Sequence, residues 1–342
     1  MPTLRRNFWI FAAICAACYP IVAYQKMESV SSRKNLPPGE NILWTDPGNV
    51  ESLDFVNGVG GEQTVPQPPF QFVDEDKAGT NPKVKVKDGA GRTWSVKFGP
   101  EAKPSVFATR MAWACGFPVE TEYFVTRGQI VGARNLKRAR NFIQGDGSFV
   151  NARFQLRADS PKYLDAFNWA WPSNPFLGTP QLNGLKVLVM MLSNWDTKDA
   201  RDRDAASNDT LADSNLAIFQ TEGDSGPRYL FMISDWGATL GRWGPGVRSK
   251  FNCRDYSNQT PGFVRGVDKG VVQWGYLGKH NEDIVQGIRT SDVQWLLQYL
   301  GRITEDQLRR GLASSGAAPE ELACFTQSIR QRIDRLQAIA KD

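Results

Sequence analysis

A β-hairpin expected near the middle of the chain constrains the fold of this sequence more than any other feature. Two short apolar runs, 215–220 and 229–234, have the composition of β-strands. The residues between them, Thr221–Arg228, are rich in Gly, Asp, Ser and Pro, which favour turns. An antiparallel hairpin brings its two open ends together. Asn215 opens the first strand and Asp235 directly follows the second, so an amide oxygen and a carboxylate are predicted to lie side by side.

The polar residues at the open end of this hairpin suit a hard metal ion. A further carboxylate, Asp196, lies upstream at the end of a helix predicted over 182–194. Oxygen ligands on a rigid strand edge, with another carboxylate nearby, favour Mg²⁺, which makes Asn215 and Asp235 candidate metal ligands. For either residue alone the alternative is a solvated turn position, because Asp and Asn are common in turns.

Charge, histidine and cysteine content exclude several classes of protein. The 342-residue chain has 41 basic and 36 acidic residues, and its net charge of +5 is too small to argue for nucleic-acid binding. His280 is the only histidine, which excludes a zinc site with two histidines, and we interpret it as a surface or helix-start residue. The five cysteines have no zinc-binding spacing, and among Cys115, Cys253 and Cys324 either a Cys253–Cys324 or a Cys115–Cys253 bridge is left open.

The N-terminal residues resemble a targeting segment. In residues 1–24, Arg5 and Arg6 precede the uncharged apolar run Phe8–Val22. This run is short for a spanning helix, which needs about 20 residues, and it predicts a signal peptide or a short membrane anchor. We therefore expect export, or membrane association through the N-terminus; the alternative is a buried N-terminal helix. Residues 25–69 are rich in Pro, Gly, Ser and Asn and are predicted to be a linker.

The first compact unit is predicted to begin at Phe70 and to be rich in strands. Residues 83–87 alternate strictly between lysine and valine, as in a half-exposed strand, and a tight turn leads to a partner strand over 93–98. On that partner strand Lys97 points away from the face that carries the apolar residues. A helix is predicted over 104–116, and from residue 290 onward apolar residues at helical spacing predict three further helices.

Several short motifs, in this order along the chain, resemble the atypical protein-kinase-like superfamily. They are Val96-Lys97-Phe98 with a helix after it, Asn194-Trp195-Asp196, Asn215-Leu-Ala-Ile-Phe219, and Ile233-Ser-Asp235-Trp-Gly237. HipA-like, phosphatidylinositol-kinase-like and secreted Golgi-type kinases are the groups they resemble most. The resemblance implies an α+β, two-lobed protein-kinase-like fold, with a small β-rich N-lobe over 70–130 and a larger, mainly helical C-lobe over 131–342.

The same resemblance implies a role for each candidate site residue. ATP would lie in the cleft between the lobes, with Mg²⁺ on Asn215 and Asp235, and the phosphoryl group would be transferred in line. Asp196 would be the catalytic base, with Asp199 as a competitor, and Lys198 would neutralise charge on the moving phosphoryl group.

On the N-lobe side, Lys97 would hold the nucleotide phosphates, and Gly79 and Thr80 would cover them through backbone N–H groups. A kinase needs a glutamate to fix this lysine, and the predicted helix has none in its interior. Glu101 is the favoured partner of Lys97, with Glu120 and Glu122 as alternatives. A second departure is the interval from Asp196 to Asn215, which an acidic insert stretches to 19 residues.

These features predict an ATP- and Mg²⁺-dependent phosphotransferase acting outside the cytoplasm or at the membrane, on a protein, lipid or glycan acceptor that the sequence does not specify. Transfer of AMP is also known among kinase-like folds. One alternative is a catalytically inactive kinase-like module of the envelope that binds a protein or a polysaccharide. A third hypothesis is a glycosidase that uses Asp196 and Asp235, with tryptophans such as Trp169 and Trp171 as sugar platforms.

Overall fold

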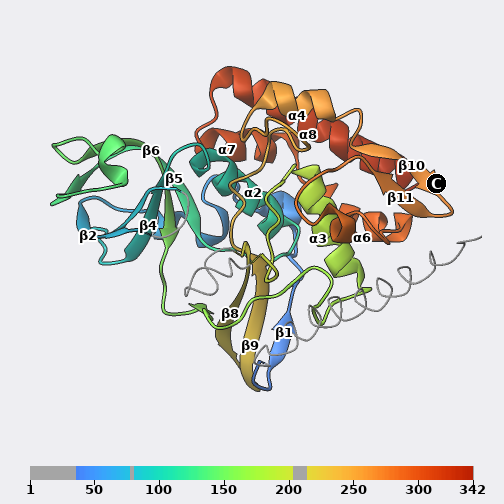
Figure 1. Cartoon of the computed structure of the whole chain (residues 1–342), viewed down its shortest axis with the longest axis horizontal. Coiled ribbons are helices and arrows are strands. Elements are labelled where there is room, and N and C mark those ends of the chain that lie inside the picture. Colours follow the sequence, from blue (N-terminus) through green and yellow to red (C-terminus); the bar gives the residue numbers. More distant parts are fainter. Residues whose placement is uncertain (1–35, 78–80, 203–213, 342) are drawn as a thin grey trace, which may run out of the picture. The chain divides into compact units, whose positions relative to one another are not determined.

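The computed structural model describes residues 36–77, 81–202 and 214–341. The fold is α+β, as predicted: a β-rich part comes first, and a larger part that contains most of the helices follows (Figure 1). The predicted targeting segment 1–24, and the predicted phosphate-covering residues Gly79 and Thr80, lie outside the described residues.

The β-rich part is a closed barrel whose strands follow the order β2-β3-β4-β6-β5. Its strands are β2 (Phe70–Asp76), β3 (Lys83–Lys87), β4 (Thr93–Phe98), β5 (Glu122–Val131) and β6 (Ser148–Leu156). Neighbouring strands are antiparallel except β2 and β5, which pair in parallel and close the barrel. The valines of β3 and Trp94, Val96 and Phe98 of β4 are buried in its core, as their alternation predicts.

One helix, α2 (Ala102–Ala114), follows β4 and packs against β5 and β6 (Figure 1). It is buried along most of its length, because it contacts the barrel on one side and α6 and α7 on another. This position explains why the helix carries few charged residues.

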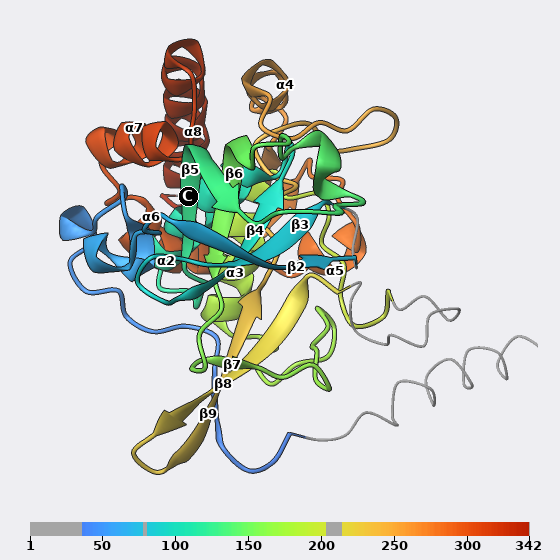
Figure 2. The same ribbon diagram turned by 90° about the vertical axis from the view of Figure 1, so that its left-hand side faces the viewer.

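The predicted hairpin is confirmed as β8 (Leu216–Gly223) and β9 (Gly226–Ile233), which pair in antiparallel register from Leu216–Ile233 to Gly223–Gly226. The turn is therefore shorter than the sequence predicted, because the strands continue into the polar residues. Two short strands extend the hairpin into a sheet of order β1-β9-β8-β7, namely β1 (Glu40–Ile42), labelled in Figure 1, and β7 (Lys162–Tyr163), labelled in Figure 2.

The larger part is built from helices. They are α3 (Pro180–Met191), α4 (Cys253–Gln259), α5 (Asn281–Ile284), α6 (Thr290–Leu300), α7 (Glu305–Ser314) and α8 (Pro319–Ile339), with a small hairpin of β10 (Val264–Asp268) and β11 (Val271–Trp274). The start of α3 is capped by the Thr179 hydroxyl, which accepts a hydrogen bond from the backbone N–H of Leu182 at 3.2 Å. Thr304 and Gln307 form a capping box at the start of α7.

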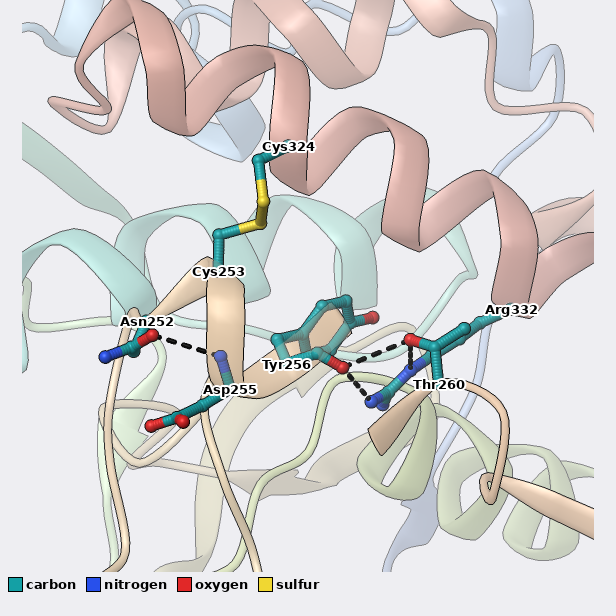
Figure 3. Close-up of a disulfide and its surroundings, with 7 residues drawn as sticks. All are labelled: Asn252, Cys253, Asp255, Tyr256, Thr260, Cys324 and Arg332. Carbon is teal, nitrogen blue, oxygen red and sulfur yellow. Dashed lines mark hydrogen bonds between the residues drawn. A yellow bond between two sulfur atoms is a disulfide. The ribbon is translucent and has the colours of Figure 1, made fainter. Parts of the chain in front are cut away.

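A disulfide joins Cys253 at the start of α4 to Cys324 on α8, one of the two pairings that the sequence left open (Figure 3). Close to it, the guanidinium of Arg332 on α8 is fully buried, and it donates hydrogen bonds to the backbone oxygen of Tyr256 and to the hydroxyl of Thr260. Figure 3 shows that these contacts and the disulfide lie between the same two helices.

Two predicted boundaries differ from the structure. The N-lobe does not end at residue 130, because β6 completes the barrel and ends at Leu156. The stretch predicted to be a linker, 25–69, is part of the fold from β1 onward, with the 3₁₀ turns Val50–Ser52, Gly58–Gly60 and Glu62–Thr64. Several of its apolar side chains, among them Val50 and Phe55, are buried, and composition alone does not predict that burial. Within the described residues, no helix is both long enough and apolar enough to cross a membrane.

Candidate functional site

The hairpin brings Asn215 and Asp235 together as its register requires. The backbone N–H of Ser234, next to Asp235, donates to the backbone oxygen of Asn215 at 2.9 Å. The side-chain amide of Asn215 donates to the backbone oxygen of Asp196 at 2.5 Å. Three residues that the sequence singled out separately therefore meet at the open end of β8 and β9.

Lys97 connects the barrel to this group of residues. Its Nζ lies 3.0 Å from Oδ2 of Asp235 and 2.6 Å from Oε2 of Glu101, and its side chain is only 9 % exposed. Glu101 is thus the partner of Lys97 among the three glutamates considered. The other two have different partners, since Glu122 pairs with Arg153 and Glu120 pairs with Arg157.

Both carboxylates beside Lys97 are held in the ionised form. Burial by itself would raise the pKa of Asp235, but Lys97, Arg153 and the backbone N–H of Gly237 hold it well below its usual range. Burial and the nearby Asp235 carboxylate act to raise the pKa of Glu101, and Lys97 and Lys250 more than offset them. Both carboxylates thus remain charged at neutral pH.

Glycine at position 237 lets α2 approach the hairpin end. The backbone N–H of Gly237 donates to Oδ1 of Asp235 at 2.8 Å, which fixes the carboxylate. A Cβ at this position would lie 2.7 Å from the Cβ of Glu101, closer than real contacts allow. The Asp235-Trp236-Gly237 sequence therefore packs directly against the residue that positions Lys97.

Asp196 and Asp199, the two competing candidates for the base, lie in different environments. Asp199 is fully buried, accepts a hydrogen bond from the backbone N–H of Trp171, and pairs with Arg201 at 2.7 Å. Asp196 is partly exposed, and its carboxylate lies 3.5 Å from Nζ of Lys198. Of the two, Asp196 is the one whose carboxylate remains accessible.

Three further residues belong to the site and were not among the predicted ones. Lys250 pairs with Oε1 of Glu101, and the side-chain amide of Asn81 donates to Oε2 of Glu101 at 2.5 Å. The side-chain amide of Asn194 donates to the backbone oxygen of Asp235 at 3.4 Å. Asn194 stands in a quoted motif and could have been found there, whereas Lys250 lies in a loop-rich stretch with no periodic pattern to single it out.

A cavity of about 320 Å³ lies beside these residues. At one end it is bounded by Lys97 and Asp235. The full lining consists of Lys83, Ser95, Lys97, Glu120, Arg153, Gln155, Arg157, Tyr163, Phe219, Ser234 and Asp235. It thus lies between the barrel on one side and β7, β8 and the residues that follow β9 on the other.

The oxygen atoms near Asp235 fit a small divalent cation. Asp235 offers a carboxylate, and Asn215 offers an amide oxygen because its nitrogen is already bonded to Asp196. The amide oxygen of Asn194, which is buried, has no hydrogen-bond partner among the described residues. A donor set of carboxylate and amide oxygens is the kind that Mg²⁺ and Mn²⁺ prefer.

No protein-family model matches the chain, and no curated protein matches it. Two solved structures illustrate what the chain is similar to. One is described as the crystal structure of the Golgi casein kinase with Mn/ADP bound, at 12 % identity and a TM-score of 0.42, covering 80 % of this chain and 72 % of that chain. The other, the Golgi casein kinase, is 11 % identical with a TM-score of 0.36, covering 80 % and 74 %.

Proposed function

We propose that this protein is a kinase-like phosphotransferase that uses ATP and a divalent cation, with Asn215 and Asp235 as metal ligands and Asp196 as the base. The observation that carries the proposal is the position of Lys97. It bridges Glu101 and Asp235 at the edge of a cavity, so the ammonium group of this lysine links the barrel, the start of α2 and the end of the hairpin.

Each side chain would have a distinct part in the transfer. Lys97 would bind phosphate oxygens of the nucleotide, and Glu101 would keep its ammonium group in place. Asp196 would accept the proton of the acceptor hydroxyl as that oxygen bonds to the γ-phosphorus and the bond to the bridging oxygen breaks, which releases ADP. Lys198, next to Asp196, would neutralise charge on the transferred group. A bound Mg²⁺ would supply further charge neutralisation on the phosphate oxygens.

We further propose that the protein works outside the cytoplasm, in solution or at the membrane. The Cys253–Cys324 disulfide supports this, because structural disulfides persist mainly in oxidising compartments. The targeting segment predicted at residues 1–24 is in keeping with it. The acceptor would be a hydroxyl group of a protein, lipid or glycan.

A thermal-shift experiment tests the nucleotide site. The full chain and Asp235→Ala are heated with ATP, with and without Mg²⁺. A ligand at 100 times its dissociation constant stabilises the folded state by about 2.7 kcal/mol, which raises the melting temperature by a few degrees. We expect a Mg²⁺-dependent rise that Asp235→Ala abolishes. If the folded wild-type protein shows no rise at millimolar ATP, the inactive module that binds a protein or polysaccharide becomes the better account.

A further inference from the structure

The end of the cavity farthest from Lys97 is lined by polar side chains of the barrel. Along β6 and just beyond it, Arg153, Gln155 and Arg157 alternate on one face. Arg153 is opposite Lys97, Gln155 is opposite Ser95, and the backbone of Arg157 bonds to Thr93. Since a strand rises about 3.3 Å per residue, Arg157 lies roughly 13 Å along the strand from Arg153. With phosphates at Lys97, a nucleobase would reach the Arg157 end.

A carboxylate and a guanidinium group meet at this end. Glu120 has a side chain that is only 11 % exposed, and its Oε1 lies 3.3 Å from Nη1 of Arg157. Its Oε2 accepts a hydrogen bond from the amide of Gln155 at 2.5 Å. The oxygen of that amide already accepts a hydrogen bond from Arg153, so both the nitrogen and the oxygen of the Gln155 side chain have partners. Glu120 and Arg157 both line the cavity and retain hydrogen-bonding capacity for a ligand at this end.

Two aromatic side chains also line the cavity. Tyr163 on β7 and Phe219 on β8 are paired in register, and their ring centroids lie 5.3 Å apart. An aromatic surface stacks against the flat face of any nucleobase and does not distinguish one base from another. Discrimination at this end would therefore fall to the polar groups that meet the edge of the base.

We propose that Glu120 and Arg157 read the Watson–Crick edge of the nucleobase, and that the cavity takes guanine at least as well as adenine. This inference rests on the proposed function, because it assumes a nucleotide whose phosphates lie at Lys97. Guanine presents two adjacent N–H donors, at N1 and N2, and an acceptor at O6. The carboxylate of Glu120 accepts from both donors, and Arg157, with five N–H groups, donates to O6 while it keeps a bond to Glu120. Adenine offers this pair only one donor and one acceptor.

The decisive variant is Glu120→Gln, probed with GTP, ATP and xanthosine triphosphate in the presence of Mg²⁺. Xanthine has a carbonyl oxygen in place of the N2 amino group of guanine. A glutamine at position 120 would donate to that oxygen and accept from N1–H, but it would leave N2 of guanine facing another donor. Sites built to hydrogen-bond a group discriminate strongly against analogues that lack it. The preference should therefore move from guanine to xanthine.

We measure the dissociation constants of the three Mg²⁺-nucleotides with the full-length chain at pH 8, where Glu120 is mostly ionised. The wild type should bind GTP at least as tightly as ATP. In Glu120→Gln we expect GTP affinity to fall by at least about tenfold and xanthosine triphosphate to become the tighter ligand. Glu222→Gln, an exposed glutamate on β8 outside the cavity, is the matched control and should leave all three constants unchanged. Arg157→Met is a second variant, on a side chain that is 43 % exposed, and it should weaken the binding of GTP more than that of ATP.

Two results would overturn the inference. Only the second would also contradict the proposed function. If the wild type binds ATP but not GTP, and Glu120→Gln leaves ATP affinity unchanged, the base is not read by Glu120 although the proposed nucleotide site stands. If none of the three nucleotides binds to the folded wild-type protein, the proposed function fails and this inference fails with it.

Discussion

The contact of Lys97 with the carboxylates of Glu101 and Asp235 leads to a prediction at the scale of single residues. Replacing Lys97 with methionine leaves the Asp235 and Glu101 carboxylates near each other without their shared cation. Lys250 and Arg153 compensate in part, so we expect Lys97→Met to lower the free energy of unfolding by about 1–3 kcal/mol at neutral pH. Urea titrations measure this change.

The pH dependence of that loss has a definite sign. The pKa of Asp235 is lowered in the folded protein, so its ion pair stabilises the fold above the ordinary pKa and is lost as the pH falls. The difference between wild type and Lys97→Met should therefore shrink toward pH 4 and below. Lys83→Met, which removes a more exposed ion pair with Asp76, is the control and should cost less than about 1 kcal/mol. An equal loss at every pH would contradict the charge-based explanation.

For Glu120 we expect the opposite dependence of protein stability on pH. Burial raises its pKa from the ordinary 4.5 to about 7; Arg157 acts against this, and the carboxylates of Glu122 and Asp235 add to it. A raised carboxyl pKa stabilises the fold below the ordinary value, and that contribution is lost as the pH rises through the folded value. The melting temperature of the wild type should therefore fall relative to Glu120→Gln between about pH 5 and pH 8. A difference that stays constant or rises over this range would show that the pKa of Glu120 is not raised in the folded protein.

At the scale of elements, the contact between α2 and the end of β9 depends on one glycine. In Gly237→Ala the new methyl group would lie 2.7 Å from Cβ of Glu101, so the start of α2 has to move away from the hairpin. Overpacking of this kind costs about 1–3 kcal/mol. Because Glu101 holds Lys97, we expect Mg²⁺-ATP affinity to fall as well, measured by titration calorimetry. Gly145→Ala is the control, since a Cβ there meets no atom within 4 Å. Unchanged nucleotide binding in Gly237→Ala would show that the position of α2 does not affect the nucleotide site.

Elements defined by local patterns could be predicted, and those that depend on distant partners could not. The hairpin β8–β9 and the helix α6 were predicted because turn residues and apolar spacing act within a few residues. Closure of the barrel needs parallel pairing of β2 with β5, and the sequence carries no local signal for it. The predicted N-lobe boundary at residue 130 falls before β6, the strand that completes the barrel.

The same distinction separates the site residues. Asn215 and Asp235 were placed together by hairpin geometry alone, and the structure brings them together. The sequence favours Glu101 but leaves the other two glutamates open, because the choice depends on how α2 packs against the hairpin end. Lys250 was missed, because it reaches Glu101 from a loop about 150 residues later in the chain.

At the scale of the whole molecule, the segment before the barrel has to be treated as part of the core. Phe55 is 2 % exposed and packs against the position of Gly311 on α7. The side-chain amide of Gln307, also on α7, donates to the backbone oxygens of Val50 and Leu53 at 2.8 and 3.0 Å. Arg110 on α2 donates to the backbone oxygen of Val56. This segment therefore links the helix beside the site to the C-terminal helices.

A single substitution distinguishes this role from that of a linker. Phe55→Ala should lower the free energy of unfolding by about 3–5 kcal/mol, because it removes a large side chain from a site that cannot fully collapse. Val59→Ala is the matched control in the same segment: its side chain is 45 % exposed, and we expect a change below about 1 kcal/mol. Denaturant unfolding measures both. If the segment were a tether, the two variants would unfold at the same denaturant concentration as the wild type. Since α2 carries Glu101 at its start, loss of the Phe55 contact should also weaken Mg²⁺-ATP binding, and Val59→Ala should leave it unchanged.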